Sequence, residues 1–175
     1  MNIIQVENDE YNTNLRDLFS EYLEWVLKMC EREFNITLNI KEMVNDAVNH
    51  SIEGLNRYLP PEGHLFLCKY DNHIVGTASM RNNGDKIGEI KRMYVLPEYR
   101  GMGIGRTLFE RLIKEAQNLQ YSKIRLDTGP FMQKAIGLYH SVGFRNIEPY
   151  PESEVLQEGV PVEIGKNWIF LEMTL

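Results

Sequence analysis

The sequence predicts a mixed α/β fold, in which a mostly antiparallel sheet carries helices on both faces. Strand-like and helix-like patterns alternate along the 175 residues without a linker-like break. Residues 64–95 hold three strand-like runs separated by turn signals, which indicates an antiparallel meander. Residues 86–128 read as strand, helix and strand, which is typical of a right-handed parallel crossover. The length favours one domain, residues 1–175.

The N-terminal third is expected to hold one strand and two helices. Residues 3–6 form a short apolar run that predicts the first strand. Thr13 is a candidate N-cap for a first helix, because apolar residues recur after it at helical spacing. The same spacing predicts a second helix over residues 40–58. The run Pro60-Pro61-Glu62-Gly63 ends this region.

The rest of the chain is expected to build most of the sheet. The predicted strands are residues 64–70, 73–80, 86–95, 123–128, 144–147 and 168–175. The predicted helices are residues 103–120 and 131–142. The first of these presents one apolar side, formed by Leu108, Leu112, Ile113, Ala116 and Leu119.

Charge and composition exclude several classes of protein. The chain has 25 acidic and 19 basic residues and no local basic run, which disfavours nucleic-acid binding. No apolar stretch approaches the roughly 20 residues that a membrane span needs. The first ten residues lack the basic and apolar segments of a signal peptide. Cys30 and Cys68 have no metal-ligand spacing and read as reduced thiols, so a cytoplasmic protein is expected.

The loop before the helix at residue 103 is the most informative segment. Gly101, Gly103 and Gly105 alternate between the end of a strand and the start of a helix. Glycine permits close approach of the backbone, and a helix start offers unpaired N–H groups and a positive dipole end. This combination suits a pyrophosphate, to which Arg100 and Arg106 could add charge-assisted contacts. The spacing fits neither common nucleotide-binding glycine motif, and a tightly packed strand-to-helix turn is the alternative.

With its flanking segments, this loop resembles the GNAT superfamily of N-acetyltransferases. The family signature, Gln or Arg, two residues, Gly, one residue, then Gly or Ala, stands here as Arg100-x-x-Gly103-x-Gly105. Residues 89–97 resemble the fourth strand of that family, and residues 135–144 resemble its second motif, which ends in Gly-Phe. These pieces cover about residues 86–150.

The resemblance implies acetyl-coenzyme A as cosubstrate, no metal, and a cofactor gap where the fourth and fifth strands splay apart. These strands are residues 86–95 and 123–128. The resemblance implies that the pantetheine arm pairs with fourth-strand backbone and that the pyrophosphate meets the loop amides. The expected cofactor contacts are Met93, Tyr94, Val95, Arg100, Gly101, Met102, Gly103, Ile104, Gly105, Arg106, Thr128, Gln133, Ala135 and Leu138.

One departure from the family pattern concerns a pantetheine contact. Many relatives carry Asn seven residues before the tyrosine of the second motif, where this chain has Met132. Either the amide contact is missing or the neighbouring Gln133 supplies it. Residues 127–130 form an alternative wall of the site.

Two residues are candidates for the chemistry of acetyl transfer. By resemblance, Tyr139 acts as general acid toward the coenzyme A thiolate, although its spacing alone favours a tyrosine packed on the sheet. Glu89 is the candidate general base, because several relatives carry theirs there. Strand periodicity places it on one face with Lys91, Met93 and Val95. The alternative for Glu89 is a surface glutamate.

The acceptor is expected to be an amine of a small molecule or a peptide. An acidic segment before the last strand favours a cationic amine, although a solvated loop has the same composition; its acidic residues are Glu148, Glu152, Glu154, Glu158 and Glu163. Aromatic residues of the first helix read as core rather than as a substrate stripe; they are Phe19, Tyr22, Trp25 and Phe34.

Three further expectations concern the histidines, the assembly and the class of function. The histidines read as structural or surface residues: His50, His64, His73 and His140. Relatives often dimerise, so a homodimer is compatible with the resemblance. The alternative to an enzyme is a non-catalytic acyl-coenzyme A-binding regulatory module of the same fold.

Overall fold

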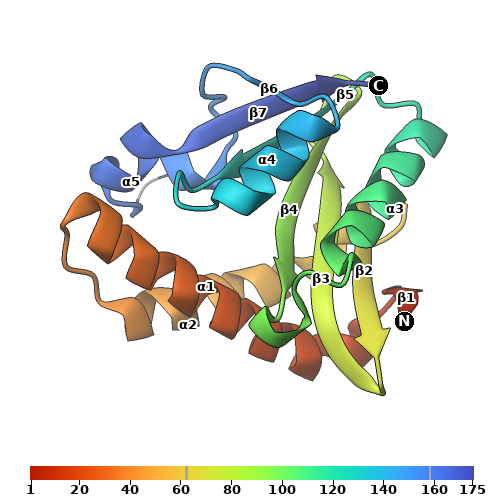
Figure 1. The fold of residues 1–175 in the computed structure, drawn as a ribbon, viewed down its shortest axis with the longest axis horizontal. Helices are drawn as coiled ribbons and strands as arrows, with labels where there is room; N and C mark the ends of the chain where they lie inside the picture. Colours follow the sequence, from red (N-terminus) through yellow and green to blue (C-terminus); the bar gives the residue numbers. More distant parts are fainter. Residues whose placement is uncertain (62, 158) are drawn as a thin grey trace.

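The computed structural model describes residues 1–61, 63–157 and 159–175, so Glu62 of the predicted turn and Glu158 of the acidic segment lie outside it. Within these residues one seven-stranded sheet runs in the order β1-β2-β3-β4-β5-β7-β6 (Figure 1). β4 and β5 are parallel, and the other neighbouring strands are antiparallel. The strands are β1 Asn2–Gln5, β2 Gly63–Tyr70, β3 His73–Asn82, β4 Ile87–Val95, β5 Lys123–Thr128, β6 Arg145–Asn146 and β7 Ile169–Thr174.

Helices cover both faces of the sheet, as the sequence predicts (Figure 1). The α-helices are α1 Asn12–Phe34, α2 Ile40–Glu53, α3 Ile104–Asn118, α4 Gln133–Ser141 and α5 Val162–Asn167. Short 3₁₀ segments join them: η1 Asp9–Tyr11, η2 Leu55–Tyr58, η3 Pro97–Tyr99 and η4 Glu154–Leu156. The sequence reading did not foresee α5 or the 3₁₀ segments.

Two apolar clusters hold the helices on the sheet. Phe66 belongs to the cluster under α3 and α4, whereas Leu65 and Leu67 belong to the cluster under α1 and α2. Successive residues of a strand point to opposite faces, so β2 contributes to both clusters and reads as a continuous apolar run. Burying both faces of the central strands is what makes the sheet a rigid support for the loops at its ends.

Three details of the helices differ from the sequence prediction. Thr13 lies inside α1, because Asn8 caps η1 by accepting a hydrogen bond from the Glu10 N–H at 3.0 Å and α1 continues directly from η1. The predicted helix over residues 40–58 divides at Gly54, whose N–H caps α2 on the His50 carbonyl. Leu119 is 38% exposed rather than inward, because α3 ends one residue before it.

The splay between β4 and β5 is present. Their parallel pairing covers only Ile87–Glu89 of β4 and Lys123–Arg125 of β5. Beyond these three pairs β4 continues to Val95 along β3, while β5 continues to Thr128 along β7. The two strands therefore diverge toward the end of the sheet where the glycine loop begins.

A bulge in β4 overturns one prediction about its faces. The register with β3 shifts between Thr77 and Ser79, and Arg92 adopts a left-handed φ of 51°. Such a bulge inserts one extra residue, so the side-chain alternation changes phase across it. The expectation that Glu89 and Met93 share a face is therefore wrong.

The side-chain contacts on the two sides of the bulge agree with this change of phase. The Arg92 guanidinium lies 5.6 Å from the ring centroid of Phe19, on the α1/α2 face. Met93 and Val95 pack against the cluster under α3 and α4. Residues 89 and 91 therefore face α1 and α2, while residues 93 and 95 face α3 and α4.

Candidate active site

The glycine loop adopts a conformation that requires glycine at two positions. Gly101 and Gly103 have φ values of 83° and 80°, in the left-handed region that L side chains rarely occupy. A Cβ added at either position would meet nothing within 4 Å in the described chain. Tight packing is therefore not the reason for these glycines. Their backbone conformation is, and the space beside them is open.

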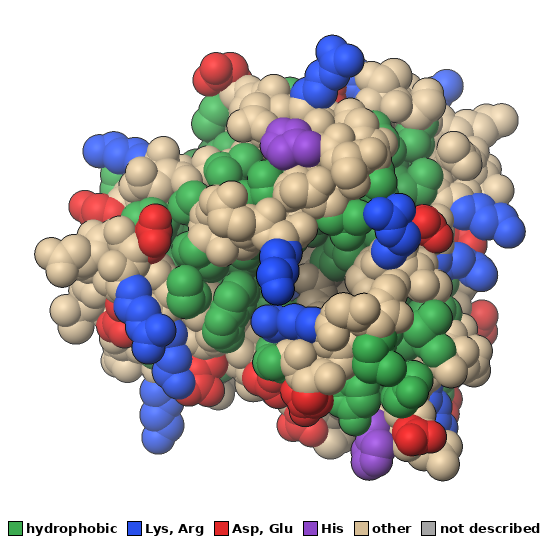
Figure 2. Space-filling view, in the orientation of Figure 1, with side chains coloured by type: hydrophobic (Ala, Val, Ile, Leu, Met, Phe, Trp, Pro, Cys, Tyr) green, Lys and Arg blue, Asp and Glu red, His purple; other side chains and the backbone are tan. Residues whose placement is uncertain are grey.

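The loop ends in a helix start with free donors. The first backbone bond closing α3 runs from the Thr107 N–H to the Gly103 carbonyl at 3.0 Å, so the preceding N–H groups have no intrahelical partner. The first turn carries Arg106 and no acidic residue. The face that carries this loop is hollowed near its middle, with Lys and Arg side chains at the rim (Figure 2). This arrangement suits a phosphate group.

Arg100 turns back toward the sheet. Its Nε donates to the Val95 carbonyl at 2.9 Å. Its guanidinium lies 5.3 Å and 5.5 Å from the ring centroids of Tyr94 and Trp25. In this position the side chain ties the loop to the end of β4 and to α1. Met102 and Arg106 point outward and are exposed.

Tyr139 combines the two readings that the sequence left open. Its ring is buried against Phe109 and Phe144, with centroid distances of 6.0 Å and 5.8 Å. Its hydroxyl nevertheless points at β4 and contacts the Met93 Sδ at 3.6 Å. Burial raises the pKa of Tyr139, so the phenol stays protonated at neutral pH. The hydroxyl is thus a proton-bearing group beside the unpaired part of β4.

The other wall of the splay is formed by the end of β5 and the start of α4. The Thr128 hydroxyl donates to the Met132 Sδ at 3.2 Å. The Gln133 amide donates to the Pro130 carbonyl and is exposed. Ala135 and Leu138 are half-buried on α4. The Gln133 side chain is therefore engaged with its own turn in this structure.

Glu89 lies at the centre of a buried ion-pair cluster. Its side chain is 0% exposed. One carboxylate oxygen accepts from Arg81 at 2.6–2.7 Å, and the other contacts the Lys91 Nζ at 3.0 Å and accepts from the Tyr150 hydroxyl at 3.1 Å. Both oxygens are thus engaged. This is the environment of a charge that holds its neighbours in place, rather than of the surface glutamate that the sequence allowed.

Asp127 ties the segment between β6 and β7 to the sheet. Its Oδ2 accepts from Lys91 at 2.5 Å and from the Ser153 hydroxyl at 2.9 Å. Its Oδ1 accepts from the Trp168 Nε1 at 3.1 Å. The sequence predicts residue 127 only as part of a wall of the site. A charged residue in each of several strands, at positions facing the same side, was the available signal for this cluster.

The cluster keeps its groups charged or protonated. Burial alone lowers the pKa of Lys91, but Asp127, Glu89 and Glu154 more than offset this, and the net pKa is raised. Burial, followed by the nearby carboxylates Asp127 and Glu89, raises the pKa of Tyr150, which therefore remains a donor. Lys91 therefore stays an ammonium ion although it is almost fully buried.

Of the described acidic residues in this segment, Glu154 alone turns away from solvent. Glu154 turns inward from η4, where its Oε1 lies 3.1 Å from an Arg81 nitrogen. Burial raises the pKa of Glu154, but the positive charges of Arg92, Lys91 and Arg81 lower it by more, so the net pKa is below its ordinary value. Glu148, Glu152 and Glu163 are exposed.

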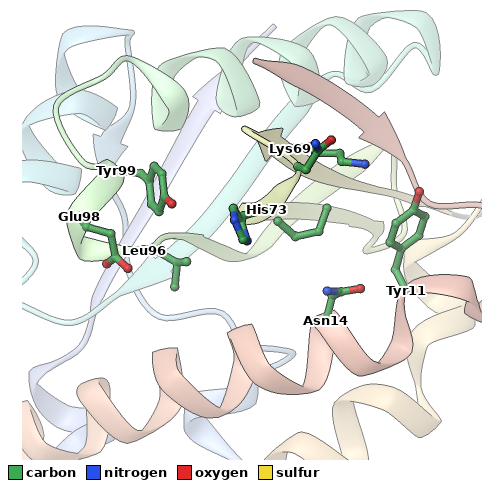
Figure 3. Close-up of a pocket in the computed structure, with 9 residues that line it drawn as sticks. Tyr11, Asn14, Lys69, His73, Leu96, Glu98 and Tyr99 are labelled. Atoms are coloured by element: carbon green, nitrogen blue, oxygen red, sulfur yellow. The ribbon is translucent and has the colours of Figure 1, made fainter.

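A metal centre and a cavity away from the splay are the other kinds of functional site to consider. Among the described residues no group of three or more His, Cys, Asp or Glu side chains could hold a metal ion. A pocket of about 440 Å³ opens between the start of α1, the β2–β3 turn and the β4–α3 loop (Figure 3). Tyr11 from η1 and Asn14 from α1 reach into it, opposite Lys69 and His73 (Figure 3). The predicted site residues, all within the described chain, line no part of it.

Comparison with known proteins agrees with this geometry. The acetyltransferase (GNAT) family model matches residues 13–144. An uncharacterised N-acetyltransferase of Schizosaccharomyces pombe is 32% identical over 136 residues, covering 76% of each chain. The IAA acetyltransferase of Azospirillum brasilense is 30% identical over 135 residues, covering 66% of this chain and 88% of its own.

Solved structures share the fold. The PaiA N-acetyltransferase of Thermoplasma acidophilum, solved in complex with coenzyme A, superposes with a TM-score of 0.71 over 100% of both chains at 16% identity. No helix in the described part of the chain is both long and apolar enough to cross a bilayer.

Proposed function

Because the chain belongs to the acetyltransferase (GNAT) family and is an N-acetyltransferase, we propose that it transfers the acetyl group of acetyl-coenzyme A to a primary amine, with Tyr139 as general acid. The acceptor is a small-molecule or peptide amine. The observation that carries the proposal is the Tyr139 hydroxyl, which contacts Met93 on the stretch of β4 that has left β5. A proton-bearing group at that point stands beside the strand edge proposed for the pantetheine arm.

The glycine loop and the start of α3 support the cofactor part of the proposal. The open loop at Gly101 and Gly103 and the free N–H groups at the start of α3 suit the pyrophosphate. The unpaired edge of β4 at Met93–Val95 suits an extended chain that adds to the sheet. For the cofactor to use the Val95 carbonyl, the Arg100 side chain has to release it.

The proposed reaction balances without a further reactant. The amine nitrogen attacks the thioester carbonyl, the carbon–nitrogen bond forms, and the carbon–sulfur bond breaks. The nitrogen loses one proton and the departing thiolate gains one. Tyr139 donates a hydrogen bond to the sulfur as negative charge develops there. Its raised pKa keeps the donor protonated throughout the neutral range.

Glu89 enters the proposal as a positioning residue. The sequence prediction of a general base needs a carboxylate that can accept a proton from the acceptor or from a linked water. The contacts of Glu89 with Arg81, Lys91 and Tyr150 occupy both oxygens. These contacts support a role in holding the charged face of β4 beneath the acceptor, a role that Glu89→Gln tests through stability and turnover measured together.

The first test is calorimetric titration with acetyl-coenzyme A, with ADP as the control, followed by thiol release with a panel of amines. Tight binding of acetyl-coenzyme A with negligible ADP binding, together with thiol release, is the expected result. Binding without release from any amine would favour the non-catalytic module. No binding by folded protein would overturn the assignment of the loop at residues 100–106.

Tyr139→Phe tests the general acid. Turnover is expected to fall at least tenfold, because general acid–base groups contribute about 10²–10⁴. The dissociation constant for acetyl-coenzyme A is expected to change little, since the ring and its packing remain. Tyr70→Phe, which removes a hydroxyl from β2, is the matched control. Unchanged turnover in Tyr139→Phe would contradict the acid role.

A further inference from the structure

We propose that the amine acceptor also carries a carboxylate and that the Arg92 guanidinium binds it, an inference that rests on the acetyl transfer proposed above. Arg92 is the residue at the β4 bulge, and its left-handed φ of 51° is a conformation that non-glycine residues rarely adopt. Such backbone outliers gather at functional sites. The bulge turns this cation onto the α1/α2 face, one residue before Met93, which contacts the Tyr139 hydroxyl.

The guanidinium is held firmly but is incompletely bonded. Its Nε and Nη2 donate to the Ser51 hydroxyl at 3.3 Å and 2.9 Å. The rings of Tyr58 and Phe19 lie 4.6 Å and 5.6 Å from its central carbon. Its Nη1 is buried without a hydrogen-bond partner in the described chain. Buried donors are nearly always satisfied in native proteins, so an orphan on a charged group points to a ligand.

The group that already stands near Arg92 indicates the chemistry of this ligand. The Oε2 of Glu154 lies 3.8 Å from the Arg92 Nη2, beyond hydrogen-bond distance. The other oxygen, Oε1, pairs with Arg81 instead. Glu154 belongs to the three-residue segment η4, and its side chain is 38% exposed. A carboxylate therefore fits beside Arg92, but the carboxylate that the chain itself provides stands too far away for the paired geometry that guanidinium groups form.

A second hollow opens at the surface beside the ion-pair cluster. Its volume is about 440 Å³, and Arg81, the partner of Glu154, lines it. Its other lining residues are Asn56, Arg57, Asn82, Asn83 and Glu152. Arg81 is already paired with Glu89 and Glu154, so the hollow adds Arg57 and three amides as donors beside the cluster. A carboxylate held by Arg92 would lie on the α1/α2 face at the bulge, one residue before the stretch of β4 that has left β5.

The test uses equilibrium binding, so that it does not depend on turnover. The protein saturated with coenzyme A is titrated calorimetrically with the twenty amino acids and with their α-carboxamides. At least one amino acid is expected to bind at least tenfold more tightly than its carboxamide. This preference is expected to disappear in Arg92→Gln and to persist in part in Arg92→Lys, which keeps the charge.

Arg16→Gln is the matched control, because Arg16 joins α1 to α2 through Asn49 at an exposed place away from the bulge. It is expected to keep the full preference. Thermal unfolding and acetyl-coenzyme A affinity of each variant show whether Arg92→Gln is folded. If it is not, Arg92→Lys carries the test, because a preference undiminished in that variant would contradict the inference.

Three outcomes would overturn the inference. They are equal binding of acids and carboxamides, a preference that survives in Arg92→Gln, and the absence of binding by every probe. Measurements of turnover distinguish a failure of the Arg92 inference from a failure of the proposed acetyl transfer. Acetylation of amines that lack a carboxylate, as efficient as that of amino acids, would support the proposed acetyl transfer and overturn the role of Arg92. Failure to bind acetyl-coenzyme A would overturn the proposed function itself.

Discussion

Replacement of Glu89 by glutamine probes the buried ion-pair cluster most directly. The variant keeps the size of the side chain and removes its charge. Glu89 is 0% exposed and contacts Arg81, Lys91 and the Tyr150 hydroxyl. The amide would offer one acceptor where the carboxylate offers two, and its NH₂ group would face a cation. Breaking one partner of a buried ion pair costs about 3–5 kcal/mol.

The lower end of this range applies here. After the substitution Arg81 keeps its contact with Glu154 at 3.1 Å, and Lys91 keeps its contact with Asp127 at 2.5 Å. We therefore expect the free energy of unfolding to fall by about 3 kcal/mol. For a chain of this length such a loss lowers Tm by about 10 °C. The free energy of unfolding of a folded domain is about 5–15 kcal/mol in total, so the variant should still fold at 25 °C.

Urea unfolding of Glu89→Gln and of a matched variant measures the difference. Glu172→Gln removes a carboxylate that pairs with Lys123 at 2.8 Å and with Arg125 at 2.7 Å, both of which are more exposed than Arg81 and Lys91. Pairs nearer the surface contribute less than buried ones, so this control should lose less than Glu89→Gln. Equal losses in the two variants would refute the reasoning. A large fall in turnover with unchanged stability would restore Glu89 as the general base.

Three further predictions concern the loop, the pH dependence of stability and the thiols. Gly103→Ala places a side chain at a φ of 80°, so the free energy of unfolding, measured in urea, should fall by about 1–2 kcal/mol. Calorimetry should also show weaker binding of acetyl-coenzyme A. Gly137→Ala on α4, where an added Cβ meets nothing within 4 Å in the described chain, should leave binding unchanged. Burial lowers the pKa of His64, so the unfolded chain takes up this proton at a higher pH than the folded chain does. The free energy of unfolding should therefore decrease as the pH falls from 7 to 5, below the unfolded pKa of about 6.5. His64→Gln should flatten that part of the stability profile, and an unchanged profile would contradict this account. Burial raises the pKa of Cys30 to about 11 and also raises that of Cys68, so a disulfide reagent should titrate these two thiols only in denaturant; rapid reaction of the native protein would be the contrary result.

Much of the architecture can be predicted from the residue pattern. The two-sided apolar runs of β2 and β3, the turn at Asp71 and Asn72, and the helical spacing after residue 103 all correspond to elements of the structure. These patterns are local, because strand and helix periods repeat within a few residues. The ends of elements were less legible. Asn8 caps η1 and displaces the start of the first helix from Thr13, and Gly54 divides the second helix.

The candidate site divides in the same way. The glycine loop and Tyr139 could be singled out from the sequence because each belongs to a contiguous motif that resembles one of the family, and the resemblance implies their roles. The fully buried position of Glu89 and its contacts with Arg81 and Tyr150 are not legible. These partners stand 8 and 61 positions away along the chain, and only the strand pairing and the return of the segment after β6 bring them together.

The residue order of this chain alone therefore specifies a sheet with helices on both faces, a glycine loop before α3 and a tyrosine in the second motif. Tertiary structure decided which way the side chains of β4 point. One inserted residue at Arg92 shifts the alternation, places Lys91 and Arg92 on the α1/α2 face and leaves Met93 beneath Tyr139. A bulge depends on how β4 pairs with β3 over its whole length, and pairing between strands is a property of the assembled sheet rather than of either segment.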